Sequence, residues 1–136
     1  MYFAQEVGGL PSTYRFAIDY CGPYSRGLAF GLGLSGVLGY TTIAGGTVSL
    51  LPAAHALLQE AADATEFSAS VSRIVGELSA KPATTLGLLA LVHFVSKHST
   101  SQSRDDVVEA AHALKPNRDL PEIAEAYDGL CELGWL

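Results

Sequence analysis

Charged side chains are scarce in this sequence, and one long stretch lacks them completely. Asp, Glu, Lys and Arg make up 16% of the 136 residues, against roughly 25% in ordinary soluble domains. None of the four occurs between Gly27 and Gln59, a segment called here the charge-free run. Because few charges are available to hydrate the surface, the composition favours contact with lipid or with a permanent protein partner.

Cysteine and histidine are also few, and their spacing does not suit metal chemistry. The two cysteines, Cys21 and Cys131, stand far apart in the sequence. We expect free thiols in a reducing compartment, with one disulfide joining the two ends as the alternative. None of the four histidines follows another at the i, i+4 spacing of a helical metal site. The sequence therefore predicts no metal and no cofactor.

Sequence motifs for nucleotide binding and for nucleophilic catalysis are weak or missing. Residues 31–36 read G-x-G-x-x-G, but no acidic residue lies at the distance that ribose recognition requires. There is no Gly-Lys-Ser/Thr sequence for phosphate, and no serine stands in a G-x-S-x-G context. The lack of these motifs argues against an enzyme.

The negative charge is confined to one half of the chain. Two acids and two arginines balance between Met1 and Gln59, so the net charge of −6 lies between Glu60 and Leu136. An acidic surface repels phosphate backbones, which argues against nucleic-acid binding. The first residues lack a basic region followed by an apolar one, so we expect no cleaved signal peptide. We expect an intracellular protein, with membrane association as an option.

The charge-free run contains seven glycines, and its pattern fits either helices or strands. A water-exposed helix is disfavoured, because each interior glycine costs about 1 kcal/mol relative to alanine. In a membrane or a tightly packed core, however, the small-xxx-small spacing of Gly27 and Gly31 lets two backbones approach closely. We therefore predict a helical hairpin with four packing or association positions: Gly27, Gly31, Gly36 and Gly39.

The alternative for residues 12–51 is a small β-hairpin element. Large and small residues alternate from Leu28 to Leu34, as in a strand, and Gly45-Gly46 can turn residues 40–43 back onto residues 47–51. Before the run, aromatic and aliphatic residues alternate with polar ones from Tyr14 to Tyr20. That pattern predicts a strand ending at Cys21-Gly22-Pro23, preceded by a short apolar N-terminal segment that Gly8-Gly9-Leu10-Pro11 isolates.

The second half of the chain is predicted to be helical. An amphipathic helix should run from Pro52 to about Ser79, and Lys81-Pro82 should end it. Residues 83–96 are apolar on nearly every side, which predicts the central core helix of this half. Two further helices are predicted by their capping residues, Ser103 before the first and Asp119, with Glu122 in a near capping box, before the second. Gly134 should end the last helix.

His93 is the one candidate functional histidine, because it lies inside the apolar helix. A buried imidazole needs a hydrogen-bond partner, and such groups sometimes titrate near neutral pH. We expect a satisfied core histidine. A pocket that His93 shared with a carboxylate or with Cys131 would instead support an enzyme.

The last eighteen residues, Asp119–Leu136, read DLPEIAEAYDGLCELGWL. They resemble the final helix of winged-helix modules, in which a Leu-x-x-x-Gly-aromatic-Leu sequence leads into the wing. Because the preceding helix is acidic here, the resemblance implies a helical protein-docking module rather than a DNA reader.

Taken together, the sequence predicts one mainly α domain over residues 1–136, a helical bundle with a glycine-rich apolar N-terminal part over 1–51 and a helical C-terminal part over 52–136. We expect a non-enzymatic structural or assembly subunit that buries its glycine-rich run in a membrane, a partner protein or a second copy of itself. The alternative function is a soluble regulatory or adaptor domain that docks partners through its acidic C-terminal helices.

Overall fold

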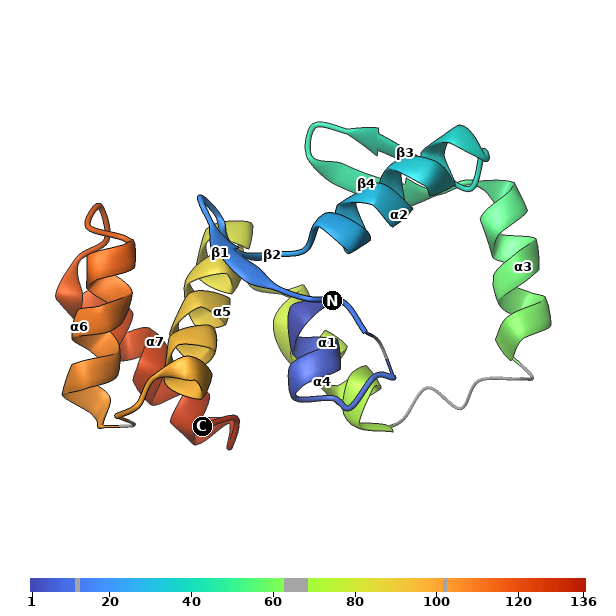
Figure 1. The fold of residues 1–136 in the computed structure, drawn as a ribbon. Helices are drawn as coiled ribbons and strands as arrows, with labels where there is room; N and C mark the ends of the chain where they lie inside the picture. The colour runs from blue at the N-terminus through green and yellow to red at the C-terminus, as the bar shows by residue number, and fades with distance from the viewer. Residues whose placement is uncertain (12, 63–68, 102) are drawn as a thin grey trace.

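The computed structural model describes residues 1–11, 13–62, 69–101 and 103–136 (Figure 1). Within these residues the fold is mainly α, as predicted, and it also contains two small antiparallel hairpins. The elements in chain order are α1 (Tyr2–Glu6), β1 (Ala17–Asp19), β2 (Gly22–Tyr24), α2 (Arg26–Val37), β3 (Thr41–Ala44), β4 (Thr47–Leu50), α3 (Pro52–Ala62), α4 (Ala69–Ser79), α5 (Ala83–His98), α6 (Arg104–Leu114) and α7 (Leu120–Glu132).

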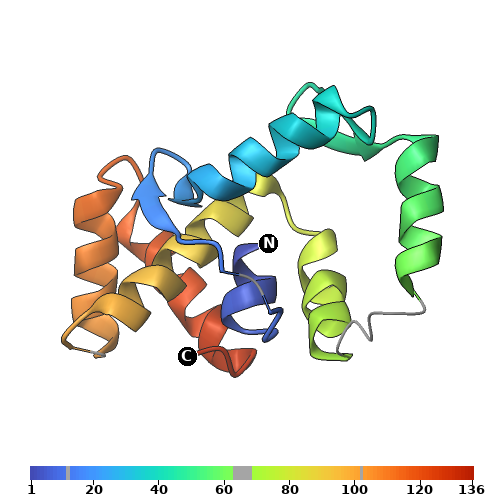
Figure 2. The same ribbon diagram turned by 45° about the vertical axis from the view of Figure 1, so that its right-hand side comes forward.

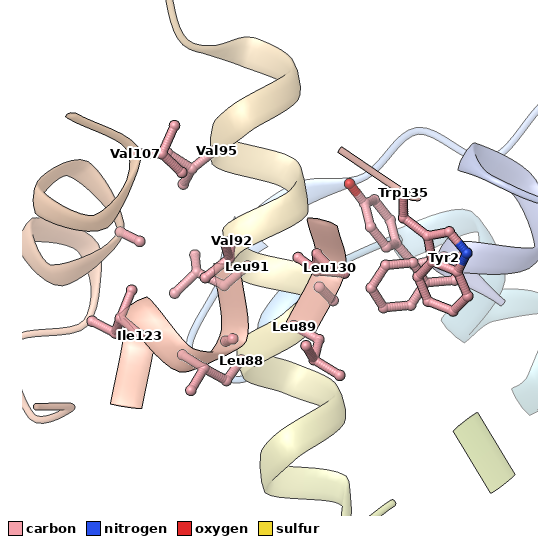
Figure 3. Close-up of a cluster of buried hydrophobic side chains, with 14 of the residues drawn as sticks. Tyr2, Leu88, Leu89, Leu91, Val92, Val95, Val107, Ile123, Leu130 and Trp135 are labelled. Atoms are coloured by element: carbon pink, nitrogen blue, oxygen red, sulfur yellow. The ribbon is translucent and has the colours of Figure 1, made fainter. Parts of the chain in front are cut away.

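Helix α5 is the centre of the hydrophobic core, which confirms its predicted role. Five consecutive residues, Leu88 to Val92, are buried, so this part of the helix is covered on all sides. It contacts α6, α7 and β2. Figure 3 shows its side chains between Val107 and Ile123 on one side and the aromatic rings of Tyr2 and Trp135 on the other.

The caps of α6 and α7 differ from one another. Ser103 caps α6 as predicted, because its Oγ accepts a hydrogen bond from the backbone N–H of Asp106 at 3.3 Å. Asp119 occupies the N-cap position of α7, but its side chain makes no capping hydrogen bond. Glu122 instead accepts a hydrogen bond from Arg118 at 2.8 Å. The expected capping box is therefore replaced by an ion pair across the first turn.

The N-terminal segment is part of the core, and the prediction that it stands apart was wrong. It forms the short helix α1, in which Tyr2 and Phe3 are buried. The ring centroid of Phe3 lies 5.1 Å from that of Trp135, and the centroid of Tyr2 lies 5.2 Å from that of Phe16. The two ends of the chain thus meet in one aromatic cluster.

The β1–β2 hairpin replaces the longer strand expected from Tyr14 to Tyr20. Only Ala17–Asp19 pair, and their partner is Gly22–Tyr24. This second strand overlaps Cys21-Gly22-Pro23, which was predicted to end the first. The hairpin turn lies directly against α5: a Cβ built on Gly87 would be 2.7 Å from the carbonyl oxygen of Cys21. The absence of a side chain at Gly87 permits this close approach.

Up to residue 50, the charge-free run is helical in its first part and a β-hairpin in its second, so each of the two predicted structures holds for only one part. Residues 26–37 are the helix α2, so the strand over Leu28 to Leu34 was wrong, and residues 41–50 are the hairpin β3–β4, so the helical hairpin was also wrong. Gly45 and Gly46 turn this hairpin as predicted, with φ values of 57° and 77°. Positive φ at both central residues is the requirement of a type I′ turn.

The amphipathic helix predicted from Pro52 to Ser79 is described in two parts. Helix α3 begins at Pro52 as expected, and α4 buries Val71 and Ile74. The predicted continuity between them falls on residues 63–68, outside the described residues. In both views α3 lies away from α5, α6 and α7, whereas α4 lies beside α1 (Figures 1 and 2).

Candidate functional site

The second hairpin and its two flanking helices leave an unusual amount of apolar surface uncovered. We call this unit, which comprises α2, β3, β4 and α3, the apolar arm. Both views show it extending to one side of the α5–α7 helices (Figures 1 and 2). Nine of the sixteen exposed large hydrophobic side chains among the described residues belong to it. They are Phe30, Leu34, Val37, Leu38, Ile43, Val48, Leu50, Leu57 and Leu58.

On α2 these side chains form a stripe. Phe30, Leu34 and Val37 follow each other at spacings of four and three residues, which places them on one face of the helix. Phe30 is 74% exposed and Val37 is 85% exposed. None of the residues of α2 is buried. A stripe of this kind normally faces a protein core, so the helix presents a packing surface to solvent.

The arm nevertheless has defined internal structure. The hydroxyls of Ser35 and Thr41 lie 2.6 Å apart and join α2 to β3. Gly39, with φ of 76°, ends α2, and the next N–H, from Tyr40, donates to the carbonyl of Ser35 at 2.9 Å. The N–H of Leu51 then donates to the carbonyl of Tyr40 at 2.9 Å. The exposed surface is therefore carried by an ordered unit.

The four glycines predicted to pack or associate have different surroundings. Gly27 and Gly31 lie against Tyr14, since a Cβ on either would be 3.5 and 3.8 Å from its ring and its hydroxyl. Gly36 lies near Thr41, at 3.8 Å from its carbonyl oxygen, and the positive φ of Gly39 serves the end of the helix. A Cβ on Gly27, Gly31 or Gly36 would therefore fit within the monomer without a clash. In the described residues, no backbone from outside α2 lies within 4 Å of a Cβ placed on Gly31.

His93 has the partner that a buried imidazole requires. Its Nδ1 lies 2.8 Å from the hydroxyl of Tyr2, and both side chains are buried. Burial lowers the pKa of His93 below its usual value and raises the pKa of Tyr2, so both groups are neutral in the fold. Neighbouring Glu6 is paired with Lys97, which lowers the pKa of that carboxyl. The arrangement is that of a satisfied core histidine.

Cys131, the other group considered as a partner for His93, is exposed on α7. Cys21 is exposed at the turn of the first hairpin. Both cysteines are free thiols, as expected.

A cavity of about 330 Å³, which was not predicted from the sequence, lies beside the turn of the β1–β2 hairpin. It is lined by residues of that turn, of the first half of α5 and of the α6–α7 loop. The one signal that points to it is Gly87, a glycine in the middle of an otherwise leucine-rich helix. Such a glycine commonly marks a close backbone approach, and here it admits the hairpin turn.

Comparison with protein families, with curated proteins and with solved structures found no match to this chain. Among the described helices, none has both the length and the apolar character needed to cross a bilayer. The last eighteen residues, Asp119–Leu136, contain α7. After Gly134 the chain folds back, and Trp135 is buried against Phe3.

Proposed function

We propose that the protein is a non-enzymatic assembly subunit that buries its apolar arm against a partner protein or a second copy of itself. The exposed stripe Phe30, Leu34 and Val37 on α2 is the observation that carries the proposal. Apolar side chains at helical spacing recognise an apolar groove on another protein, with these positions as anchors. The absence of charge over residues 27–59 means that no charged side chain of this run loses hydration on docking.

The energetics of α2 support a partner. This helix has twelve residues, and isolated helices shorter than about 12–15 residues are marginal in water. Four of its residues are glycines, each costing about 1 kcal/mol relative to alanine. Burial of the Phe30 and Leu34 side chains would contribute about 1.5–3 kcal/mol each. Association therefore supplies the burial that the rest of the chain does not provide.

The remainder of the molecule suits the role of a base for the arm. We infer that α5, α6 and α7 form a helical bundle, which the aromatic cluster around Tyr2 and Trp135 closes at the end where the two termini meet. The β1–β2 hairpin is fixed on α5 at Gly87, and β2 leads directly into α2. This arrangement would hold the arm at a defined position while leaving its surface uncovered.

Light scattering after gel filtration of the full chain, without detergent, tests the proposal. We expect the wild type to form an oligomer, or to elute as a single copy in complex with a bound partner. The variant Phe30→Gln/Val37→Gln should lose that association. The matched control is Leu114→Gln/Leu120→Gln, which changes two exposed leucines outside the arm. A wild type that stays monodisperse and monomeric without a partner at every accessible protein concentration would refute the proposal.

The same variants distinguish a membrane from a protein. If the wild type instead sediments with phosphatidylcholine vesicles, and Phe30→Gln/Val37→Gln does not, the arm docks on lipid. Fractionation of the native protein between membrane and soluble pools gives the corresponding result in cells. We propose an intracellular location for either form.

The second candidate is an adaptor that docks partners through α6 and α7. Glu109, Glu125 and Glu132 on these helices are exposed, and none forms a salt bridge within the described part of the chain. Free carboxylates on a firmly packed surface would attract a basic partner. Glu125→Lys/Glu132→Lys should then abolish binding while Phe30→Gln/Val37→Gln preserves it. The opposite pattern assigns the interface to the apolar arm.

A further inference from the structure

Three separate parts of the fold meet around the 330 Å³ cavity. Tyr20 and Cys21 come from the turn of the β1–β2 hairpin, Thr84 from the first turn of α5, and Lys115 and Arg118 from the α6–α7 loop. The volume lies within the range of roughly 300–1,000 Å³ that small-molecule sites usually have. Its lining includes no residue of the apolar arm.

The walls of the cavity divide into an apolar part and a cationic part. Ala83, Leu88 and Leu91 of α5 give it an apolar wall, and both leucines are buried. Lys115 and Arg118 of the α6–α7 loop give it a cationic part. Helix α5 begins beside them without a side-chain cap, so the partial positive charge of its first turn adds to theirs.

The two cations are not equally available. Arg118 donates to Glu122 at 2.8 Å, which offsets its charge. Lys115 forms no salt bridge with any described carboxylate, and its Nζ lies 5.0 Å from the centre of the Tyr20 ring. A lysine held over an aromatic ring without an acid retains its capacity to pair with an incoming anion.

The loop that carries Lys115 is held in place before any ligand arrives. The N–H of Lys115 donates to the carbonyls of Ala111 and His112, both at 3.0 Å, and the N–H of Arg118 donates to the carbonyl of Lys115 at 3.0 Å. The ring Nδ1 of His112 also lies 2.9 Å from the carbonyl oxygen of Arg118. Because the loop is ordered, binding an anion there costs little conformational entropy.

We propose that this cavity binds a small carboxylate with an apolar body, such as a medium-chain fatty acid. The carboxylate pairs with the ammonium of Lys115 and approaches the start of α5, while the apolar body lies along Leu88 and Leu91. A neutral molecule of the same length would lack the charged contact. Larger anions with several charges are disfavoured, because most of the lining surface is apolar.

Cys21 provides a direct test, because it lines the cavity and is exposed, whereas Cys131 is exposed on α7 outside it. Iodoacetamide alkylation of each thiol in the full chain is followed by peptide mass spectrometry, with octanoate as the probe and 1-octanol as its neutral match. At about ten times its Kd, octanoate leaves about one site in ten empty, so alkylation of Cys21 should slow about tenfold. Alkylation of Cys131 should not change.

Variants of Lys115 separate charge recognition from general hydrophobic binding. Lys115→Gln should weaken octanoate about tenfold, because a charge-assisted contact is lost, and Lys115→Arg should retain most of the affinity. Far-ultraviolet circular dichroism and an unchanged alkylation rate at Cys131 show that each variant is folded. The proposal is overturned if octanoate protects neither thiol or both equally, if 1-octanol protects Cys21 as well as octanoate does, or if Lys115→Gln binds octanoate like the wild type.

Discussion

Helices α5 and α2 have similar apolar composition and opposite surroundings. Neither contains an acidic residue, and each carries its positive charge only at one end. Yet α5 buries eight of its sixteen residues, while α2 buries none. Apolar composition therefore marks a helix that needs a partner, and it does not say whether the partner belongs to the same chain.

The difference arises from what surrounds each helix in the chain. Helix α5 is followed by α6 and α7, whose inward residues Val107, Ile123 and Leu130 are fully buried against it. Helix α2 is followed by the hairpin β3–β4, in which only Thr41 is buried. A two-stranded hairpin covers too little surface to complete a core. We therefore propose that the apolar arm is one half of an interface.

A matched pair of leucines tests this difference between α5 and α2 most directly. Leu91 of α5 is 1% exposed and Leu34 of α2 is 47% exposed. Leu91→Ala should lower the free energy of unfolding by about 2–5 kcal/mol, because it opens a cavity in the core. Leu34→Ala should change it by less than about 0.5 kcal/mol in the monomer. Urea denaturation of both variants measures the difference.

If Leu34→Ala proved as destabilising as Leu91→Ala, the arm would be packed within the monomer. That result would remove the basis for the assembly proposal. The measurement should be made at a protein concentration where the wild type is monomeric, since association would add its own contribution to Leu34.

A matched pair of glycines tests the attachment of the β1–β2 hairpin. A Cβ on Gly87 would lie 2.7 Å from the carbonyl oxygen of Cys21, so Gly87→Ala forces the hairpin away from α5 and should cost about 1–3 kcal/mol. Gly76 of α4 has nothing within 4 Å of the same position. Gly76→Ala should therefore stabilise the protein by up to about 1 kcal/mol. Equal effects at both glycines would contradict the observed approach.

Local signals predicted the second half of the chain well. Pro52, Ser103 and Gly134 mark helix ends where the structure has them, and the apolar stretch at residues 83–96 is the central helix. These signals act over a few residues, so the sequence carries them completely. The Gly45-Gly46 turn was predicted for the same reason.

Structural features that depend on distant residues were not predicted. The burial of α1 depends on Trp135, more than 130 positions away. The alternation from Leu28 to Leu34 suits a strand and a helix equally, and the position of the hairpin that follows is needed to choose between them. The cavity was missed because the residues that line it come from three separate elements. Glu122 was misjudged because Arg118, four residues earlier, competes for its carboxylate.

The pH dependence of stability distinguishes the buried core from the exposed arm. Burial holds the pKa of His93 below its usual value of 6.5, so the unfolded chain binds more protons than the folded one when the pH falls below that value. The free energy of unfolding should therefore decrease as the pH falls from 7 to 5.5. Glu6, whose pKa is lowered by its hydrogen bond with Lys97, adds a loss of the same sign below about pH 4.5.

Variants of the hydrogen-bonded pair assign this slope. Tyr2→Phe/His93→Phe removes both partners of the 2.8 Å contact and leaves no unpaired polar group there, so its stability should be nearly flat between pH 7 and 5.5. Tyr2→Phe alone keeps the imidazole and should retain the slope. Thermal unfolding at several pH values provides the measurement, and a slope that survives in the double variant would exclude His93 as its source.

The smallest expected effect comes from Gly33, and it has opposite signs in the monomer and in the assembly. Gly33 lies on the same face of α2 as Phe30 and Val37, three residues after one and four before the other, and nothing lies within 4 Å of a Cβ placed there. Gly33→Ala should therefore stabilise the monomer by up to about 1 kcal/mol through helix propensity. If a partner's backbone approaches this face, Gly33→Leu should weaken association more than Gly33→Ala, because overpacking grows with side-chain size. Dissociation constants from sedimentation equilibrium, set beside monomer stability from urea denaturation, separate the two effects. Association that is unchanged in both variants would show that the interface lies on another face of the arm.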